Sequence, residues 1–323
     1  MQGNKNIKII LKSGLGFLLF AYMGYSLFRQ IQQQEHLKEA LTHLLDWHNS
    51  TRWIYLALVF ILMLLNWFCE AEKWRLLMRS TETMSRLSAM QAVLTGVSVS
   101  MLTPNRIGEY AGRILYLKNK HKLKGITVTL VGSLAQVLVS AVLGSIGLGI
   151  YWRTIHQASP IFLIYLGISV LLAIGLSILY MNLYWVSSFC ARFEYLRKIR
   201  IYIDVVRRFP KHLLWQVLGI STLRFLVYSL QLILLFYFVQ IQAPFFTLLG
   251  MAWAIFWTLA VVPTIALAEL GVRGQTAVFF MSAISGNMLG IVTAMLLLWF
   301  INLIIPALTG CLFVFNMKLY DDE

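Results

Sequence analysis

Long apolar runs separated by short polar and basic segments dominate the hydrophobicity pattern of this chain. Eight apolar segments stand out, at about 10–29, 53–70, 88–103, 125–151, 160–186, 213–239, 246–266 and 288–315. A membrane-spanning helix needs about 20 apolar residues, because the hydrocarbon core of a bilayer is about 30 Å thick. All of the segments except 88–103 and 246–266 read as full spans, so the pattern predicts about six of them.

The two exceptions are interrupted by proline. The segment at 88–103 is rich in Ser, Thr and Gly and ends at Pro104, and the segment at 246–266 contains Pro263. Irregular backbone is tolerated within a bilayer only where protein or a polar cavity surrounds it. We therefore predict two broken or re-entrant helix hairpins, over 86–113 and 246–283.

Composition agrees with a membrane protein. The chain has 323 residues, of which 12% are charged, and its mean hydropathy is +0.74. Soluble domains carry about 25% charged residues. The N-terminal apolar run has no small-residue cleavage site, so it is predicted to be a first span rather than a cleaved signal. The expected fold is an all-α polytopic membrane protein that forms one integral membrane domain over 1–323.

Most of the 27 Lys and Arg lie in the N-terminus, in the loops after the second, third and fifth apolar segments and at the C-terminus. Positive residues concentrate on the cytoplasmic side of a membrane. This bias fits six full spans, both termini cytoplasmic, and two hairpins that open from opposite sides. The second half, 160–316, would then be an inverted copy of the first half, 7–159.

A shift of 160 residues supports this repeat. It places Glu109 on Glu269 and Arg113 on Arg273, and it brings Pro104 to within one position of Pro263. Paired interruptions in corresponding halves of a chain are typical of a transporter with a site near the bilayer midplane.

The Glu-x-x-x-Arg spacing puts both side chains on one helix face, where they can pair. Inside a membrane such charges mark functional sites, because each one costs free energy unless it is paired or hydrated. Arginine also recognises phosphate through its planar fork. The candidate substrate-binding residues are Arg106, Glu109, Arg113, Arg224, Glu269 and Arg273, and the candidate helix-break or structural residues are Pro104, Gly108, Pro263 and Gly271.

Alternatives stay open at these positions. Arg106 and Arg113 also fit ordinary positive residues near the cytoplasm, with Glu109 neutralising one of them. Arg224 fits three roles, because it can pair with Glu269, line a cavity, or extend toward the cytoplasmic interface. The polar residues Asn66, Gln136 and Gln231 within spans are typical of interhelical hydrogen bonds.

No catalytic motif is recognised, so an enzyme is not expected. An intramembrane glutamic protease would need two adjacent glutamates, but Gly108 and Ala268 precede the two candidates. The three cysteines show no metal spacing, and neither a metal nor another cofactor is expected. The basic segment 117–124 lacks interleaved aromatic residues, so nucleic acid is not an expected partner.

The stretches TPNRIGEYAGR and PTIALAELGVR resemble the flippase-like transmembrane region of the lysylphosphatidylglycerol synthase family. The first matches the family pattern Pro-x-x-x-Gly-Glu-x-x-x-Arg through Pro104, Gly108, Glu109 and Arg113. The second departs from it, because Gly274 stands where the family commonly has glutamate after Gly-Val-Arg. The sequence ends at Glu323 without an aminoacyl-transferase domain, so we expect a stand-alone member.

The resemblance implies a bacterial cytoplasmic (inner) membrane protein whose partner is a lipid with an anionic headgroup. We expect a flippase-like transporter that moves an anionic glycerophospholipid or a polyprenyl-phosphate-linked lipid between leaflets through a polar cavity, as a monomer or a homo-oligomer. The alternative is a membrane-embedded transferase or an accessory subunit in envelope glycolipid synthesis. A scaffold without a cavity is the third possibility. It would keep Glu109 and Glu269 away from water, each in an ion pair with a nearby residue of its own helix.

Overall fold

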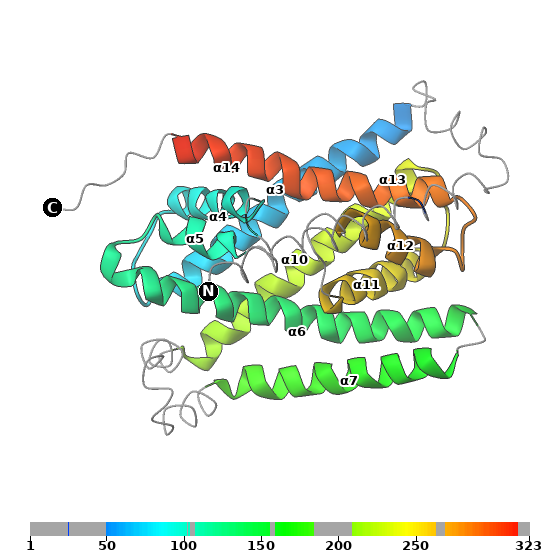
Figure 1. The fold of residues 1–323 in the computed structure, drawn as a ribbon, viewed down its shortest axis with the longest axis horizontal. Helices are drawn as coiled ribbons and strands as arrows, with labels where there is room; N and C mark the ends of the chain where they lie inside the picture. Colours follow the sequence, from blue (N-terminus) through cyan, green and yellow to red (C-terminus); the bar gives the residue numbers. More distant parts are fainter. Residues whose placement is uncertain are drawn as a thin grey trace, which may run out of the picture.

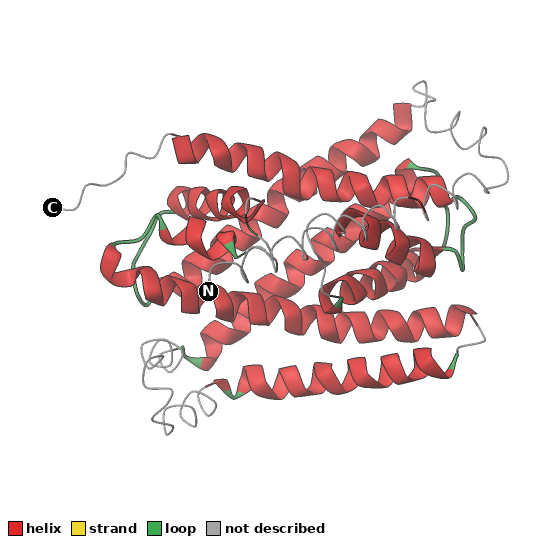
Figure 2. Ribbon diagram, in the orientation of Figure 1, coloured by secondary structure: helices red, strands yellow, loops and turns green. Residues whose placement is uncertain are grey.

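The computed structural model describes Tyr25 and residues 50–101, 103, 107–155, 159–183, 209–262 and 269–315. These residues form helices and contain no β-strand, so the all-α prediction is confirmed for them (Figure 2). Apart from Tyr25, the first predicted span at 10–29 lies outside the described residues. Pro104, Arg106 and Pro263 also lie outside them, and their roles stay predictions.

Within the described ranges, five helices are long and apolar enough to cross a membrane. They are α3 (Ser50–Met78), α6 (Lys122–Ile155), α7 (Pro160–Met181), α10 (Lys211–Phe238) and the continuous helix formed by α13 (Met288–Trp299) and α14 (Ile305–Phe315). Each corresponds to a predicted span. A π-helical segment, Phe300–Ile304, joins α13 to α14 shortly before Pro306, which lacks the N–H that a regular helix uses there.

The two interrupted segments form helix pairs. In the first pair, α4 (Arg86–Met101) is followed by the short helix α5 (Gly108–Ile114), which packs against it. In the second, α11 (Phe245–Val261) is followed by α12 (Glu269–Met281). Figure 1 shows the first pair toward one end of the long axis of the bundle and the second toward the other. The helix breaks therefore fall where the sequence predicts them, and the inverted relation of the two halves stays a prediction.

The helix ends that flank the basic loops lie on the same side of the molecule. Figure 1 places the C-terminal ends of α3 and α7 and the N-terminal ends of α6 and α10 at one end of the bundle. The C-terminal end of α14 also lies there. This arrangement agrees with the grouping of loops that the charge pattern predicts, while the assignment of that end to the cytoplasm stays a prediction.

Glycines allow the first helix pair to pack backbone against backbone. A Cβ atom on Gly112 would lie 2.6 Å from Gly96 Cα and 2.8 Å from the Gly96 nitrogen. A Cβ on Gly108 would overlap the Val99 carbonyl oxygen, and the Gly108 N–H donates a hydrogen bond to Thr103 Oγ1 at 2.7 Å. On the other side of α4, Gly310 of α14 approaches Leu94 equally closely. Small residues at such contacts are typical of membrane helices.

We expect Gly112→Ala to destabilise the protein by about 1–3 kcal/mol, because an added methyl group in a fully packed contact forces the two helices apart. The matched control is Gly175→Ala in α7, where an added Cβ would have no neighbour within 4 Å. Thermal unfolding of both variants in detergent checks this expectation. Equal melting temperatures for the two variants would contradict the close packing of α4 on α5.

Candidate functional site

A buried carboxylate, Glu70 of α3, pairs with cations of α3, α5 and α10. Its Oε2 atom lies 2.7 Å from Lys73 Nζ and 2.9 Å from Arg224 Nη1. Its Oε1 atom accepts a hydrogen bond of 2.9 Å from Arg113 Nη2. The side chains of Glu70, Lys73 and Arg113 are only 7%, 2% and 2% exposed. Glu70 is therefore the shared counter-ion of three cations and ties α5 and α10 to α3.

Both predicted Glu-x-x-x-Arg pairs form ion pairs in the structure. Arg113 Nη2 contacts Glu109 Oε1 within α5. Arg273 Nη2 lies 2.6 Å from Glu269 Oε1 within α12, and Arg273 Nε donates to the same oxygen at 3.1 Å. Each glutamate occupies the first turn of its helix, where a negative charge is favoured by the helix dipole. Arg113 therefore bridges two carboxylates, Glu109 and Glu70.

One carboxylate, two amide oxygens and one aromatic ring hold Arg224. Besides its ion pair with Glu70, Arg224 donates from Nε to Asn66 Oδ1 at 2.9 Å and from Nη1 to Gln136 Oε1 at 3.3 Å. The guanidinium carbon lies 5.6 Å from the centre of the Trp67 ring, a distance at which a cation is attracted to an aromatic face. The guanidinium is thus fixed in position before any ligand arrives.

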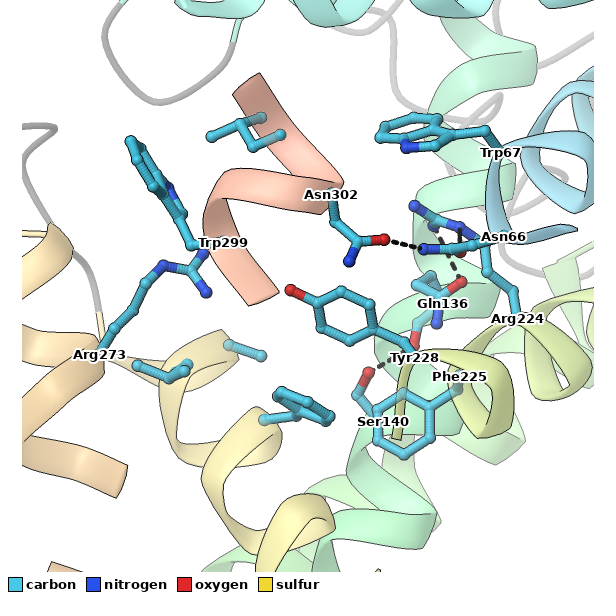
Figure 3. A pocket seen from close by; sticks show the side chains of 14 residues that line it. Asn66, Trp67, Gln136, Ser140, Arg224, Phe225, Tyr228, Arg273, Trp299 and Asn302 are labelled. Atoms are coloured by element: carbon cyan, nitrogen blue, oxygen red, sulfur yellow. Dashed lines mark hydrogen bonds between the residues drawn. The ribbon is translucent and has the colours of Figure 1, made fainter. Parts of the chain in front are cut away.

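Arg224 opens onto a cavity of about 320 Å³ between the helices (Figure 3). Its walls come from α3, α6, α10, α11, α12, α13 and the π-helical segment. The lining residues are Asn66, Trp67, Gln136, Ser140, Arg224, Phe225, Tyr228, Phe256, Leu259, Ala260, Arg273, Trp299, Asn302 and Leu303. The cavity therefore combines aromatic surface with amides and two arginines.

The two cavity arginines approach from opposite sides. Figure 3 shows Arg273 on one side and Arg224 on the other, with Asn302 and Tyr228 between them. Asn302 is held in place because Asn66 Nδ2 donates to its Oδ1 at 3.1 Å and its own Nδ2 donates to the Leu298 carbonyl at 3.2 Å. The carboxylate partners of the arginines, Glu70 and Glu269, do not line the cavity.

The structure divides the predicted substrate-binding residues into two groups. Arg224 and Arg273 line the cavity, whereas Glu109, Arg113 and Glu269 do not. Arg113 is buried, and it shares the carboxylate of Glu70 with Arg224. Direct contact of Arg113 with substrate stays a prediction, and in this structure its partners are carboxylates. Of the three roles open to Arg224, the structure shows the cavity-lining one, with Glu70 as its partner in place of Glu269.

Residue-level reasoning from sequence missed Glu70. The sequence does contain a signal for Glu70. It stands at the end of the apolar segment 53–70, four residues after Asn66, and this spacing places the two side chains on one face of α3. Asn66 and Gln136, expected only to join helices, also line the cavity. Gln231 fits the expectation, since its Nε2 donates to the Val59 carbonyl at 2.9 Å. Gly271 is buried within α12.

Comparison with known protein families identifies the family of this chain. The sequence model described as the lysylphosphatidylglycerol synthase TM region matches residues 9–310. The chain belongs to this family. No match was found among the curated proteins. Together with the spanning helices, membership in the lysylphosphatidylglycerol synthase TM region family makes the chain a multi-pass membrane protein of a lipid-related process.

Three residues of the pattern Pro-x-x-x-Gly-Glu-x-x-x-Arg lie in α5 of this lysylphosphatidylglycerol synthase TM region, namely Gly108, Glu109 and Arg113. Gly108 permits the close approach of α5 to α4, and Arg113 connects α5 to Glu70. Glu109 and Glu269 are paired locally, as a scaffold without a cavity would have them. The cavity beside Arg224 and Arg273, however, contradicts that third possibility.

Proposed function

We propose that this protein moves a lipid with an anionic headgroup between the two leaflets of a membrane, and that the headgroup passes through the cavity between Arg224 and Arg273. The observation that carries the proposal is the presence of these two arginines on opposite walls of one cavity inside an apolar bundle. Charged residues at membrane depth are costly and almost always serve a ligand or ion path. An anionic headgroup is the ligand that two arginine walls favour.

The size of the cavity supports a headgroup rather than a whole lipid. Small-molecule sites commonly have volumes of about 300–1,000 Å³, and the cavity of about 320 Å³ is at the lower end of this range. The acyl or prenyl chains would then stay in the bilayer while the polar group enters the protein. Membership in a lipid-related membrane family agrees with a lipid as the substrate.

In the proposed mechanism the headgroup phosphate exchanges between the two arginines. Arg224 is held by Glu70, Asn66 and Gln136, so it is oriented before the phosphate arrives and loses little freedom on binding. Arg273 pairs with the carboxylate of Glu269 at 2.6 Å. These carboxylates balance the arginines while the cavity is empty. Movement would follow the concentration gradient of the lipid.

The proposed location is the bacterial cytoplasmic membrane with both termini in the cytoplasm. The end of the bundle that carries the basic loops would then face the cytoplasm, with the α4–α5 pair near it and the α11–α12 pair near the outer face (Figure 1). Under this orientation the two helix pairs would serve opposite leaflets, as a lipid path across the membrane requires.

Reconstitution in liposomes tests the proposed function. Fluorescent phosphatidylglycerol in both leaflets would be exposed to a reductant that reaches only the outer leaflet. We expect wild-type protein to bring inner-leaflet lipid to the surface faster than protein-free vesicles do. Arg273→Gln is expected to lower the rate of lipid translocation about tenfold or more. The variant loses the charged group that would bind the phosphate, and hydrogen bonds to charged groups contribute about 1.5–3 kcal/mol.

The control variant is Arg153→Gln, since Arg153 is exposed at the end of α6 and does not line the cavity. It should translocate lipid at the wild-type rate. If all three proteins match protein-free vesicles, the transport proposal fails, and a transferase or accessory role becomes the better explanation. If Arg273→Gln matches wild type, the proposed path through the cavity is wrong.

A further inference from the structure

A π-helical turn interrupts the last long helix of the bundle. The Ile305 N–H donates to the carbonyl of Phe300, five residues earlier, whereas a regular α-helix uses the residue four positions earlier. Pro306 comes next and supplies no N–H. Turns of this kind are frequent at functional sites, and π-helical turns and prolines are the usual places where helices bend. The segment Phe300–Ile304 (the π-turn) is therefore a place where this helix can change its direction.

The helix that follows the π-turn is held by the first helix pair. Ser98 Oγ of α4 donates a hydrogen bond of 2.5 Å to the Ala307 carbonyl of α14. A Cβ atom on Gly310 would lie 2.1 Å from the Leu94 carbonyl oxygen, so the two backbones are in direct contact. Glycine at such a contact lets membrane helices approach closely. This packing leaves α14 little freedom to turn on α4, so the two helices form one rigid unit.

The helix that precedes the π-turn is held by the second helix pair and by α10. Ile291, Met295 and Leu298 of α13 have no exposed surface, and α13 packs against α12 and α10. At its start, Asn287 Nδ2 donates to the Val239 carbonyl at the end of α10, at 3.4 Å. Figure 1 shows α13 and α14 end to end, with α13 toward the second pair and α14 toward the first. Along this helix, the π-turn would absorb a movement of one pair relative to the other.

The π-turn also forms part of the cavity wall. Asn302 and Leu303 line the cavity. Asn302 Oδ1 accepts from Asn66 Nδ2 at 3.1 Å, and Asn66 Oδ1 accepts from Arg224 at 2.9 Å. Successive residues of a helix point about 100° apart, so a shift of the hydrogen-bond pattern by one residue would turn Asn302 away from Asn66. A change in the π-turn therefore reaches the side chains that hold the cavity arginine.

We propose that the π-turn is a hinge about which the α11–α12 pair and the α4–α5 pair move relative to each other. The hydrogen bond between Asn66 and Asn302 breaks when the bend at the hinge changes. Protein hinges are a few residues that absorb a change in backbone angles between parts that stay rigid. Here the rigid parts are the packed helix pairs with α13 and α14. The proposal goes beyond the proposed function, because it concerns movement within the protein whatever ligand the cavity takes.

Spin-label distances test the hinge directly. In a cysteine-free background, labels at Leu296 and Leu308 lie on opposite sides of the π-turn, and both positions are exposed. Leu130 and Val142 of α6 are the matched control pair, because they are also exposed and have the same separation along the chain. Each pair spans about 18 Å of helix. We expect the pair across the π-turn to give a distance distribution at least about twice as wide as the control pair, because bending adds a range of interhelical angles.

A variant without the π-turn tests whether the hinge matters for activity. A π-helical turn holds one residue more than a regular turn, so deleting Ile304 together with Pro306→Ala should give a continuous α-helix without turning α14 relative to α13. We expect its distance distribution to narrow to the width of the control pair and lipid translocation to fall about tenfold or more, because such movements set many turnover rates. Phe300→Leu is the control within the π-turn, since this side chain is half-exposed and does not line the cavity. It should keep the wide distribution and the wild-type rate.

The distances decide the proposal independently of transport, and they do so in the labelled full-length sequence even where the deletion variant fails to fold. A distribution across the π-turn as narrow as that of the control pair would overturn the hinge. Wild-type translocation in a folded deletion variant with a narrow distribution would also overturn it. A wide distribution in a protein that moves no lipid would support the hinge and contradict the transport proposal.

Discussion

Replacing Arg224 with glutamine is expected to reduce lipid translocation about 10- to 100-fold while leaving the protein folded. The activity falls because the variant removes the cavity cation that is oriented by three partners, and a charge-assisted contact contributes about 1.5–3 kcal/mol. The fold survives because Glu70 keeps Lys73 and Arg113 as partners. Liposome translocation rates and melting temperatures of the same preparations give the two readouts.

Arg224→Lys separates charge from geometry. A lysine ammonium keeps the positive charge but lacks the planar fork that reaches several acceptors at once, so Asn66 and Gln136 would no longer be held by one group. We expect translocation between that of wild type and that of Arg224→Gln. A wild-type translocation rate in Arg224→Gln would show that translocation does not require binding of the headgroup to this arginine.

The spacing of residues along the chain predicts local features of the structure well. The i to i+4 spacing predicts the pairing of Glu109 with Arg113 and of Glu269 with Arg273, and both ion pairs form. Hydropathy and proline positions likewise predict the described spans and the two helix breaks. These features depend on neighbours within one or two helical turns, so one sequence contains the information that they need.

The organisation around Glu70 depends on distant parts of the chain. Glu70 meets Arg113 across 43 residues, and Asn66 meets Arg224 across 158 residues. Asn302 contacts Asn66 from 236 residues away. No spacing rule relates such positions, because the packing of α3 against α10 and the other spans decides which of them meet. The sequence therefore indicates that Arg224 is an intramembrane charge, and only the fold supplies its partner.

Glu70→Gln should have the largest effect on stability of any single substitution at this site. The change removes the counter-ion shared by three cations, and Glu109, which pairs with Arg113, is then the remaining carboxylate of this cluster. Removing one partner of a buried ion pair typically costs about 3–5 kcal/mol, because an uncompensated charge is left in the interior. Here the loss leaves Lys73, which is 2% exposed, without a carboxylate. We expect a large fall in melting temperature and in the yield of monodisperse protein.

Glu72→Gln is the matched control for this prediction, since it makes the same chemical change two residues further along α3. Glu72 pairs with Arg75 at the edge of the bundle, where the two side chains are 19% and 28% exposed. Glu72 also lies 3.6 Å from Arg86, whose side chain is 71% exposed. Ion pairs near the surface contribute about 1 kcal/mol or less, so this variant should lose much less stability than Glu70→Gln. The double variant Glu70→Gln, Lys73→Met removes a buried cation that has lost its carboxylate. It should therefore recover part of the melting temperature lost in Glu70→Gln. Equal melting temperatures for the Glu70 and Glu72 variants would show that Glu70 does not stabilise the fold as the shared counter-ion.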